Sequence, residues 1–160
     1  MEIHIIWAQD INGGIGEKGK LPWHISKDLK NFKELTINST IIMGRKTWDS
    51  LPIKPLPDRR NIVISNSPQS NIESYTSIEG CIESLNNDTK ISDVYIIGGM
   101  SIYKFFYKHA NTLHITFIHK RYPDTDTFFP ISLDTIKSDF HLKSKDDVNK
   151  DLSFTVWIRK

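Results

Sequence analysis

Asp28 is the residue in this chain that is best placed for chemistry. It lies in the stretch 21–35, where apolar residues recur at helical spacing. At about 100° per residue, Phe32 falls about 40° and Ile25 about 60° from Asp28, so the carboxylate shares the apolar stripe of its own helix. An acid in the first helical turn also compensates the helix dipole, which is the simpler interpretation. Because that role requires no particular face, and a carboxylate that points at the core needs a polar partner, we interpret Asp28 as a binding-site carboxylate.

Residues 13–20 hold four glycines between the first expected strand and the Asp28 helix. Residues 14–19 match the G-x-G-x-x-G pattern of dinucleotide-binding folds, but in those folds the helix begins at once. Here Pro22 and Trp23 intervene, so we reject the match. A segment this rich in glycine favours a mobile lid that closes over a ligand, and a plain surface loop is the alternative.

Two strand-to-helix junctions contain glycine. The stretch 40–48 runs from an apolar strand through Gly44 into two cations and a threonine. Free backbone N–H groups at such a helix start suit a phosphate, although a capping turn with solvated cations explains the pattern equally well. The stretch 94–103 ends a buried strand in Gly98-Gly99 and then opens a helix, which lets the backbone approach a ligand. Tight packing of strand against helix is the alternative there.

Three further polar segments are weak signals when taken alone. In 55–61, Arg59 is displayed from a proline-stiffened turn and could grip a carboxylate in bidentate fashion. Residues 65–67 follow the next strand and could face a phosphate or make a turn, and the acids of 124–130 could simply form turns. Most arginines are surface charges, so these segments need support from the rest of the chain.

The composition predicts an ordinary globular chain with a single domain, 1–160. A net charge of +2 gives no reason to expect nucleic acid or a membrane surface as a partner. A single cysteine excludes an intrachain disulfide and, with no apolar signal segment, predicts a cytoplasmic location. The six histidines lack metal-ligand spacing and no Ser/His/Asp or Cys/His set stands out, so we expect no metal site.

The hydrophobic pattern predicts an α/β fold with a largely parallel central sheet, because strand-like apolar runs alternate with helical patterns. The expected strands are 3–8, 40–43, 61–65, 93–97 and 112–118, and the expected helices are 26–36 and 77–86. Ser26 is a good N-cap for the first helix. Alternation in 153–159 predicts a half-exposed antiparallel strand that closes one side of the sheet, and the Lys- and Asp-rich segment 143–151 is expected to be a polar turn.

Together these segments resemble the dihydrofolate reductase family. The family's order and spacing are matched over essentially the whole chain by LPWHISKDLKNF, IIMGRKTW, PLPDRRNIVIS, VYIIGGMSIY and DTDTFFP. The resemblance implies a mostly parallel sheet of about eight strands with an antiparallel C-terminal strand, flanked by helices. It also implies an NADPH-dependent monomer that reduces 7,8-dihydrofolate to tetrahydrofolate for one-carbon metabolism and thymidylate synthesis. Hydride would pass from nicotinamide C4 to pterin C6, with protonation at N5.

The resemblance assigns roles at the substrate. Asp28 would bind the pyrimidine of the pterin, helped through water by Thr116, and Trp23 would hold an ordered water and help close the site. Arg59 would clamp the glutamate carboxylate of the substrate, with Lys33 nearby. The other residues implied at the substrate are Ile6, Ala8, Leu29, Phe32, Leu51, Ile97 and Tyr103.

The resemblance also implies where NADPH would bind. The pyrophosphate would meet the two glycine junctions, and the nicotinamide would lie beside the glycine-rich segment with its C4 roughly 3–3.5 Å from pterin C6. Asp126 would hydrogen-bond the lid near Gly16 and favour its closed state. The full set implied at the cofactor is Ala8, Ile15, Gly16, Gly44, Arg45, Lys46, Thr47, Ser65, Asn66, Gly98, Gly99, Met100, Ser101, Ile102, Tyr103 and Thr127.

Several positions depart from common patterns of the family. Trp7 replaces a smaller residue next to the pocket and is expected to reshape the pocket floor. Met100 follows the glycine pair where Gly or Ala is usual, which predicts a tighter cofactor turn. Asp58 stands beside Arg59 and is expected to weaken its grip on a substrate carboxylate by competing for the guanidinium. Asn66 makes the preference for NADPH over NADH harder to predict than the reaction.

Two other functions fit parts of the pattern. One is a related pyrimidine or pterin reductase, against which the combination of Asp28, Phe32 and Arg59 argues, because a ligand without a glutamate tail would not need the arginine. The other is a catalytically silent domain that binds nucleotide or has a structural role. The intact glycines and central acid argue against the silent domain, and NADPH binding without turnover would support it.

Overall fold

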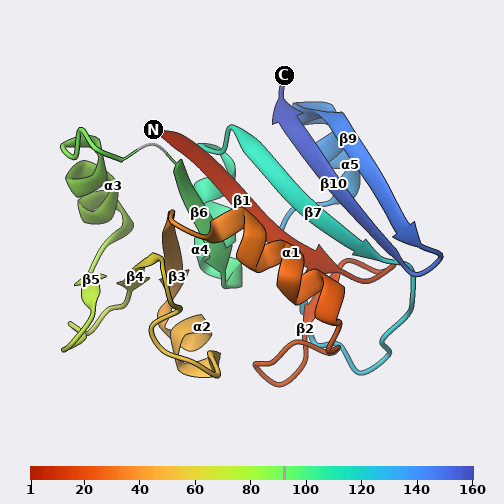
Figure 1. The fold of residues 1–160 in the computed structure, drawn as a ribbon, viewed down its shortest axis with the longest axis horizontal. Coiled ribbons are helices and arrows are strands. Elements are labelled where there is room, and N and C mark those ends of the chain that lie inside the picture. The colour runs from red at the N-terminus through yellow and green to blue at the C-terminus, as the bar shows by residue number, and fades with distance from the viewer. Residues whose placement is uncertain (92) are drawn as a thin grey trace.

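A computed structural model describes residues 1–91 and 93–160. These residues form an eight-stranded sheet, a small two-stranded sheet and five helices (Figure 1). The strands are β1 (Glu2–Gln9), β2 (Gly14–Gly16), β3 (Thr40–Gly44), β4 (Arg60–Ile64), β5 (Glu73–Tyr75), β6 (Asp93–Gly98), β7 (Thr112–Ile118), β8 (Thr127–Phe128), β9 (Phe140–Asn149) and β10 (Leu152–Arg159). The helices are α1 (Ser26–Thr36), α2 (Arg45–Ser50), α3 (Ile78–Asn86), α4 (Met100–Tyr107) and α5 (Leu133–Asp139).

The large sheet has the order β5-β4-β3-β6-β1-β7-β10-β9. The strands from β5 to β7 run parallel, and β10 pairs antiparallel with both β7 and β9. This confirms the predicted α/β fold with a mostly parallel sheet and an antiparallel C-terminal strand. It also places β1 in the interior of the sheet, as its nearly continuous apolar run predicts.

The segment 143–151, expected to be a polar turn, is mostly strand. β9 occupies Phe140–Asn149, and only residues 150 and 151 make the turn to β10. Nearly all side chains of β9 are exposed because it is the last strand of the sheet. Its conformation depends on backbone pairing with β10 rather than on burial, so no apolar alternation marks it in the sequence.

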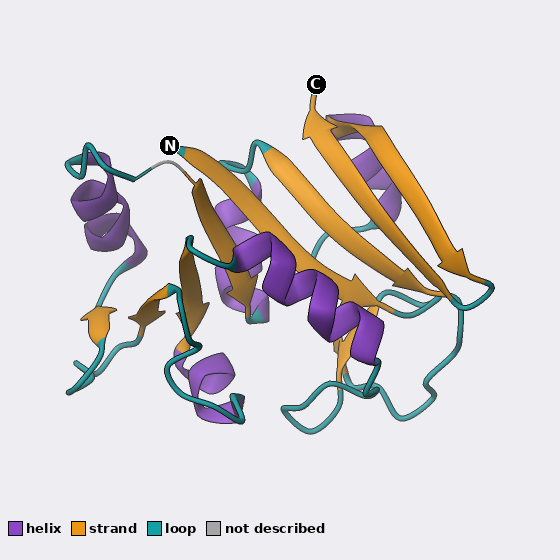
Figure 2. Cartoon of the chain, viewed as in Figure 1, coloured by secondary structure: helices purple, strands orange, loops and turns teal. Residues whose placement is uncertain are grey.

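Helices cover the two faces of the sheet (Figure 2). On one face α1 packs through Phe32 and Leu35 against a cluster that includes Ile6 and Tyr95. On the other face α3, α4 and α5 pack against a larger cluster. The alternation of β1 serves both faces, because Ile6 points toward α1 and Trp7 toward α4.

Trp7 does not shape the pocket floor, contrary to the expectation. Its indole stacks on Phe129 with ring centroids 3.6 Å apart and an angle of 4° between the planes. Its Nε1 donates to Gln9 Oε1 at 2.8 Å, which keeps the polar atom satisfied within the core. Adjacent strand residues face opposite sides of a sheet, so the large residue at position 7 packs on the α4 side and Ala8 packs in a different cluster.

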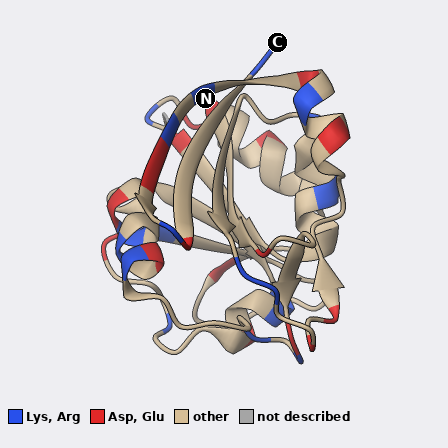
Figure 3. Ribbon diagram, turned by 90° about the vertical axis from the view of Figure 1, so that its right-hand side faces the viewer, with Lys and Arg blue, Asp and Glu red and all other residues tan. Residues whose placement is uncertain are grey.

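Charged residues lie mainly on the helices, the connecting segments and the edge strand β9, with both signs interspersed, and the strands at the centre of the sheet are mostly uncharged (Figure 3). None of the helices in the described part of the chain has both the length and the apolar character needed to cross a membrane. Among the same residues, no three His, Cys, Asp or Glu side chains gather as a metal-binding group.

A histidine pair, the half-buried His4 and the buried His114, lies on the sheet beside Tyr95. His4 Nδ1 lies 2.9 Å from His114 Nε2, and His4 also stacks on Tyr95 with ring centroids 4.5 Å apart. Asp93 Oδ1 lies 3.3 Å from His4 Nε2. The pKa of His114 is lowered to about 4, mainly by burial and to a smaller extent by the neighbouring His4.

The low pKa of His114 predicts loss of stability in weak acid. The unfolded chain takes up a proton near the ordinary value of 6.5, whereas the folded protein resists it until about pH 4. The contribution of His114 to the free energy of unfolding should therefore fall by about 3 kcal/mol as the pH drops from 7 to 4. Urea denaturation at several pH values measures this, and His114→Gln should flatten the dependence. The exposed His141→Gln should not, and an equal acid slope in both variants would contradict the assignment to His114.

Candidate active site

Asp28 lies in the first turn of α1 and is half-buried against the sheet. Ile25 and Phe32 flank it and pack into different apolar clusters, so the carboxylate lies between two apolar contacts, as the helical spacing predicts. Burial raises the pKa of Asp28, and hydrogen bonding to the side chain of Thr116 opposes the rise. A carboxylate in this environment favours a ligand that donates hydrogen bonds or carries a proton.

The helix that carries Asp28 has the expected bounds, 26–36, but Ser26 is not its N-cap. Ile25 occupies the N-cap position, with no side-chain cap, and Ser26 is the first helical residue. The carbonyl of Ile25 accepts hydrogen bonds from the backbone N–H groups of Asp28 and Leu29, each at 3.1 Å. Trp23 and Ile25 are anchored in an apolar cluster, and this tertiary packing outweighs the capping preference of serine.

The floor beneath Asp28 comes from the adjacent strands β6, β1 and β7. Ala8 of β1 is in register with Thr116 of β7. The hydroxyl of Tyr103 lies 3.0 Å from Ile6 O and 2.8 Å from Ile97 O, and so links β1 to β6. Tyr103 itself is buried in the α4 side of the core, so its contribution here is through those two backbone oxygens.

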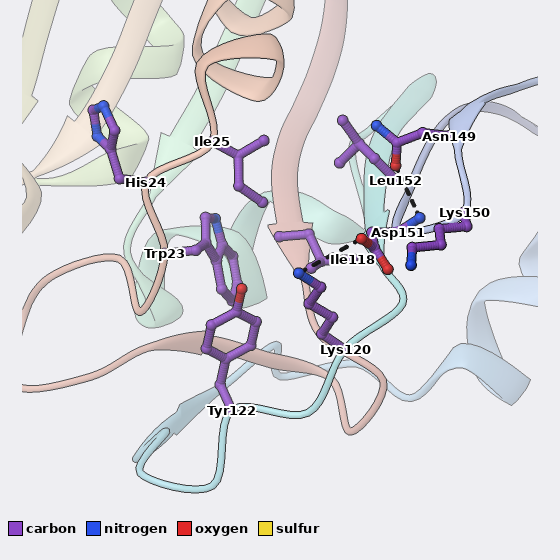
Figure 4. Close-up of a pocket in the computed structure, with 10 residues that line it drawn as sticks. All are labelled: Trp23, His24, Ile25, Ile118, Lys120, Tyr122, Asn149, Lys150, Asp151 and Leu152. Atoms are coloured by element: carbon purple, nitrogen blue, oxygen red, sulfur yellow. Dashed lines mark hydrogen bonds and ion pairs between the residues drawn. The ribbon is translucent and has the colours of Figure 1, made fainter.

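Trp23 forms the other side of the site. Its side chain is 8% exposed, and its Nε1 is buried without a hydrogen-bond partner among the described residues. Its ring lies against Tyr122, with centroids 5.2 Å apart. Figure 4 shows these two rings at one side of a groove that extends to the turn between β9 and β10. The groove has a volume of about 420 Å³, and its lining does not include Asp28. A buried N–H donor of this kind suits a polar ligand atom or a bound water.

An apolar wall continues from Asp28 toward the end of α1. Phe32, Leu51 and Ile97 pack on the same cluster as Ile6, which brings together predicted residues from four segments. Leu29 lies at the rim and is 42% exposed. Leu56 packs on this cluster as well, and the sequence argument missed it. The proline residues on both sides of Leu56 mark a fixed position, so PLPDRRN held a usable signal.

Arg59 is held at the far end of this wall. Its Nε donates to Pro57 O at 2.8 Å, and its Nη1 donates to Thr36 Oγ1 at 3.1 Å. The guanidinium lies 6.0 Å from the centre of the Phe32 ring. Burial lowers the pKa of Arg59, and the charge of Asp58 opposes that shift. Asp58 and Arg59 form no ion pair in the described structure, so Asp58 does not compete with a ligand carboxylate for Arg59 through direct contact. Lys33 is exposed.

The two glycine junctions lie side by side at the carboxyl ends of β3 and β6. Gly44 and Gly99 occupy the N-cap positions of α2 and α4, and no side chain caps either helix within the described residues. Gly98 has φ of +136°, and a Cβ there would lie 3.0 Å from Thr47 Oγ1. The peptide bond between Gly98 and Gly99 is cis. This narrow, donor-rich edge requires glycine and suits an anionic group.

The remaining residues expected at the cofactor fall into two groups. Arg45 and Lys46 are exposed, and Arg45 Nε lies 3.7 Å from Asp49 Oδ2. Ser65 is buried, and its Oγ accepts hydrogen bonds from Ser67 N and Gln69 Nε2, so only its own proton remains to be donated. Asn66, Ser101 and Met100 are exposed, and because Met100 is 51% exposed its side chain does not crowd the turn. Ile102 packs in the core, and its side chain lies close to Gly44.

Part of the glycine-rich segment is a β-strand. β2 (Gly14–Gly16) pairs with β8, and Thr127 is in register with Gly16. Asp126 N donates to Gly16 O at 3.0 Å, and the carboxylate of Asp126 accepts from Lys18 N at 2.9 Å. The predicted contact between Asp126 and this segment is therefore present, and Ile15 packs against the core.

Comparison with known proteins agrees with this geometry. The sequence profile described as dihydrofolate reductase matches residues 2–159. Dihydrofolate reductase from Ureaplasma parvum is 35% identical over 137 residues, covering 86% of this chain and 87% of the relative. The Bacillus subtilis enzyme is 35% identical over 149 residues, covering 93% and 86%.

The chain belongs to the dihydrofolate reductase family. A solved dihydrofolate reductase from Enterococcus faecalis, complexed with NADP(H) and RAB-propyl, has a TM-score of 0.86 and 31% identity to this chain. The match covers 99% of this chain and 96% of that one. The family assignment and the enzyme class inferred from the motifs are thereby confirmed, and the eight-stranded fold is that of the dihydrofolate reductase family.

The raised pKa of Asp28 predicts that this carboxylate lowers the stability of the ligand-free protein. Ionisation costs more in the folded protein than in the unfolded chain, so the penalty develops as the pH rises above 3.8 and is complete above the folded pKa. Asp28→Asn should raise the free energy of unfolding at pH 7, and this gain should shrink toward zero below pH 3.8. Urea denaturation at both pH values measures the change.

The matched control is Glu34→Gln, an exposed acid on the wet face of the same helix, which should change stability little at either pH. A loss of stability in Asp28→Asn at pH 7 would contradict the proposed desolvation penalty.

Proposed function

We propose that this protein reduces 7,8-dihydrofolate to tetrahydrofolate with NADPH, acting as a monomer, and so supplies one-carbon metabolism and thymidylate synthesis. The observation that carries the proposal is the half-buried carboxylate of Asp28, with Thr116 beside it and an apolar wall leading to Arg59. A folate has the matching sequence of groups, because a pyrimidine with N–H donors is joined through an aromatic ring to a carboxylate. Membership of the family supports the same substrate.

Asp28 would bind the pyrimidine through its N3 and 2-amino groups. Desolvation of the carboxylate favours uptake of a positive or proton-donating partner, which would stabilise the pterin form that is ready for reduction. Thr116 would support the carboxylate, and the buried Nε1 of Trp23 would hold a water at the mouth of the site. The proton for N5 would come from water rather than from Asp28 directly.

Arg59 would bind the glutamate carboxylate. Pro57 O and Thr36 Oγ1 fix its guanidinium, and the Phe32 ring lies beside it, so little side-chain freedom is lost when a carboxylate binds. Lys33 would add charge nearby. The apolar wall between Asp28 and Arg59 would hold the aromatic part of the substrate.

The residues of the cofactor region fit NADPH. The uncapped N-termini beside Gly44 and Gly99 present backbone N–H groups that suit the pyrophosphate, and at Gly98 a Cβ would crowd Thr47. Arg45 would meet the 2′-phosphate, and Ile15 would lie beside the nicotinamide. NADPH supplies the hydride, and the chain supplies position and electrostatics.

The first test follows NADPH oxidation with 7,8-dihydrofolate for the intact protein and for Asp28→Asn. We expect turnover in the intact protein and a loss of about 10²–10⁴-fold in the variant at neutral pH, because the variant cannot favour the protonated pterin. The loss should shrink at low pH, where the substrate is protonated in solution. NADPH binding without oxidation in the presence of dihydrofolate would contradict the proposed reaction and favour a silent binding domain.

The hydrogen bond from Arg59 to Thr36 predicts a change confined to substrate binding. In Thr36→Val the guanidinium loses a buried partner, so KM for dihydrofolate should rise by about fivefold while kcat stays close to that of the intact protein. Thr36→Ser keeps the acceptor and should restore KM.

Steady-state kinetics with a dihydropterin that lacks the glutamate tail provide the control. Thr36→Val should leave kcat/KM for this substrate unchanged, because Arg59 then has nothing to bind. An equal loss with both substrates would show that the substitution acts through α1 and not through Arg59.

A further inference from the structure

Asp10 is a buried acid that the sequence argument did not use. It follows β1 directly, and only 2% of it is exposed. No Lys, Arg or His pairs with it in an ion pair among the described residues. Its carboxylate accepts hydrogen bonds from three backbone N–H groups instead, those of Asn12 at 2.9 Å, Gly14 at 2.8 Å and Tyr122 at 3.2 Å.

These three donors belong to two different segments. Asn12 and Gly14 lie in the glycine-rich segment, here called the glycine loop (11–20), and Tyr122 lies in the segment after β7, here called the distal loop (119–127). One carboxylate therefore fixes the start of both loops. Ile11 N also donates to Lys120 O at 3.2 Å, which brings the two backbones together at the same place.

The packing around Gly14 shows how closely the two loops fit at this point. A Cβ at Gly14 would collide with Thr125 Cγ2 and lie 3.0 Å from Asp10 Oδ1. A second carboxylate joins the loops at the exposed end of the glycine loop, where Lys18 N donates to Asp126 Oδ2, and Asp126 N also donates to Gly16 O. Asp10 holds the buried end and Asp126 the exposed end, so Ile15 and Gly16 lie between two carboxylate anchors.

We propose that Asp10 is a positioning residue for the reaction, whose buried carboxylate sets the angle at which the glycine loop leaves β1 and so places Ile15 and Gly16 over the cofactor site. The expected effect on catalysis rests on the proposed function, whereas the structural role of Asp10 rests on its hydrogen bonds alone. Charged hydrogen bonds to three backbone N–H groups resist movement more strongly than neutral ones. Loss of the carboxylate releases the loop at its base and leaves the substrate contacts of Asp28 and Arg59 in place.

The test compares Asp10→Asn with Asp124→Asn, an exposed acid of the distal loop. Asparagine keeps the size of the side chain but puts an N–H₂ group where an acceptor is needed. In single-turnover experiments, counted per NADPH-binding site, we expect hydride transfer about tenfold slower in Asp10→Asn, with KM for dihydrofolate within about twofold of the intact protein. Asp124→Asn should match the intact protein.

Two readouts do not need catalysis. Trypsin should cut after Lys18 and Lys20, which are exposed in the glycine loop, at least several-fold faster in Asp10→Asn than in the intact protein. In the intact protein, hydrogen exchange of the Gly14 and Tyr122 amides should be slower than that of the Lys18 amide, whose acceptor is exposed. This second measurement decides the question even if the variant fails to fold.

An unchanged hydride-transfer rate per site in folded Asp10→Asn overturns the proposal, as does fast exchange at Gly14 and Tyr122. Slower hydride transfer without faster cutting of the loop also overturns it, because the effect would then not act through the loop. If the intact protein shows no turnover of dihydrofolate but the loop readouts behave as expected, the proposed function fails and the structural role of Asp10 stands.

Discussion

The site depends on the partial desolvation of one carboxylate. Asp28 projects from an otherwise apolar helix stripe onto the sheet, where burial opposes its ionisation and Thr116 offers only partial compensation. Helix α1, the floor strands β6, β1 and β7, and the apolar wall toward Arg59 all serve to hold that group at a fixed depth. A fully exposed acid would be hydrated and would gain little from binding a hydrogen-bond donor of the ligand, and a fully buried one would be neutral.

The residues around Asp28 were predictable because each follows a local rule. Helical periodicity put Asp28 and Phe32 on one face, and glycines at strand ends marked the junctions beside β3 and β6. Both rules depend only on neighbours in sequence, and both survive in the folded protein. The mostly parallel sheet followed from the alternation of strands and helices, and the antiparallel β10 followed from its own alternation of apolar and polar residues, whereas the order of the strands was not predicted.

What the sequence did not predict depends on distant partners. Asp10 has no pattern around it, since its three donors come from the next few residues and from a segment more than a hundred positions away. β9 is mostly polar and exposed after Phe140, and its strand conformation depends on pairing with β10. The side of the sheet that Trp7 occupies follows from the strand period, and the stack on Phe129 is visible only in three dimensions. Ser26 lost the N-cap position to Ile25, because packing of the preceding segment decides where the helix starts.

The polar edge strand β9 has a consequence for self-association. Its outer edge has backbone groups free of β10, and such an edge is a template for a second copy. If two copies paired antiparallel about a twofold axis at Ser144, Lys143 of each would face Lys145 of the other. If the axis lay between Asp146 and Asp147, those two acids would face each other across the axis. Like charges directly opposite one another oppose pairing in these two registers, so the charges that hid this strand from prediction also disfavour two of the ways in which a second copy could extend the sheet.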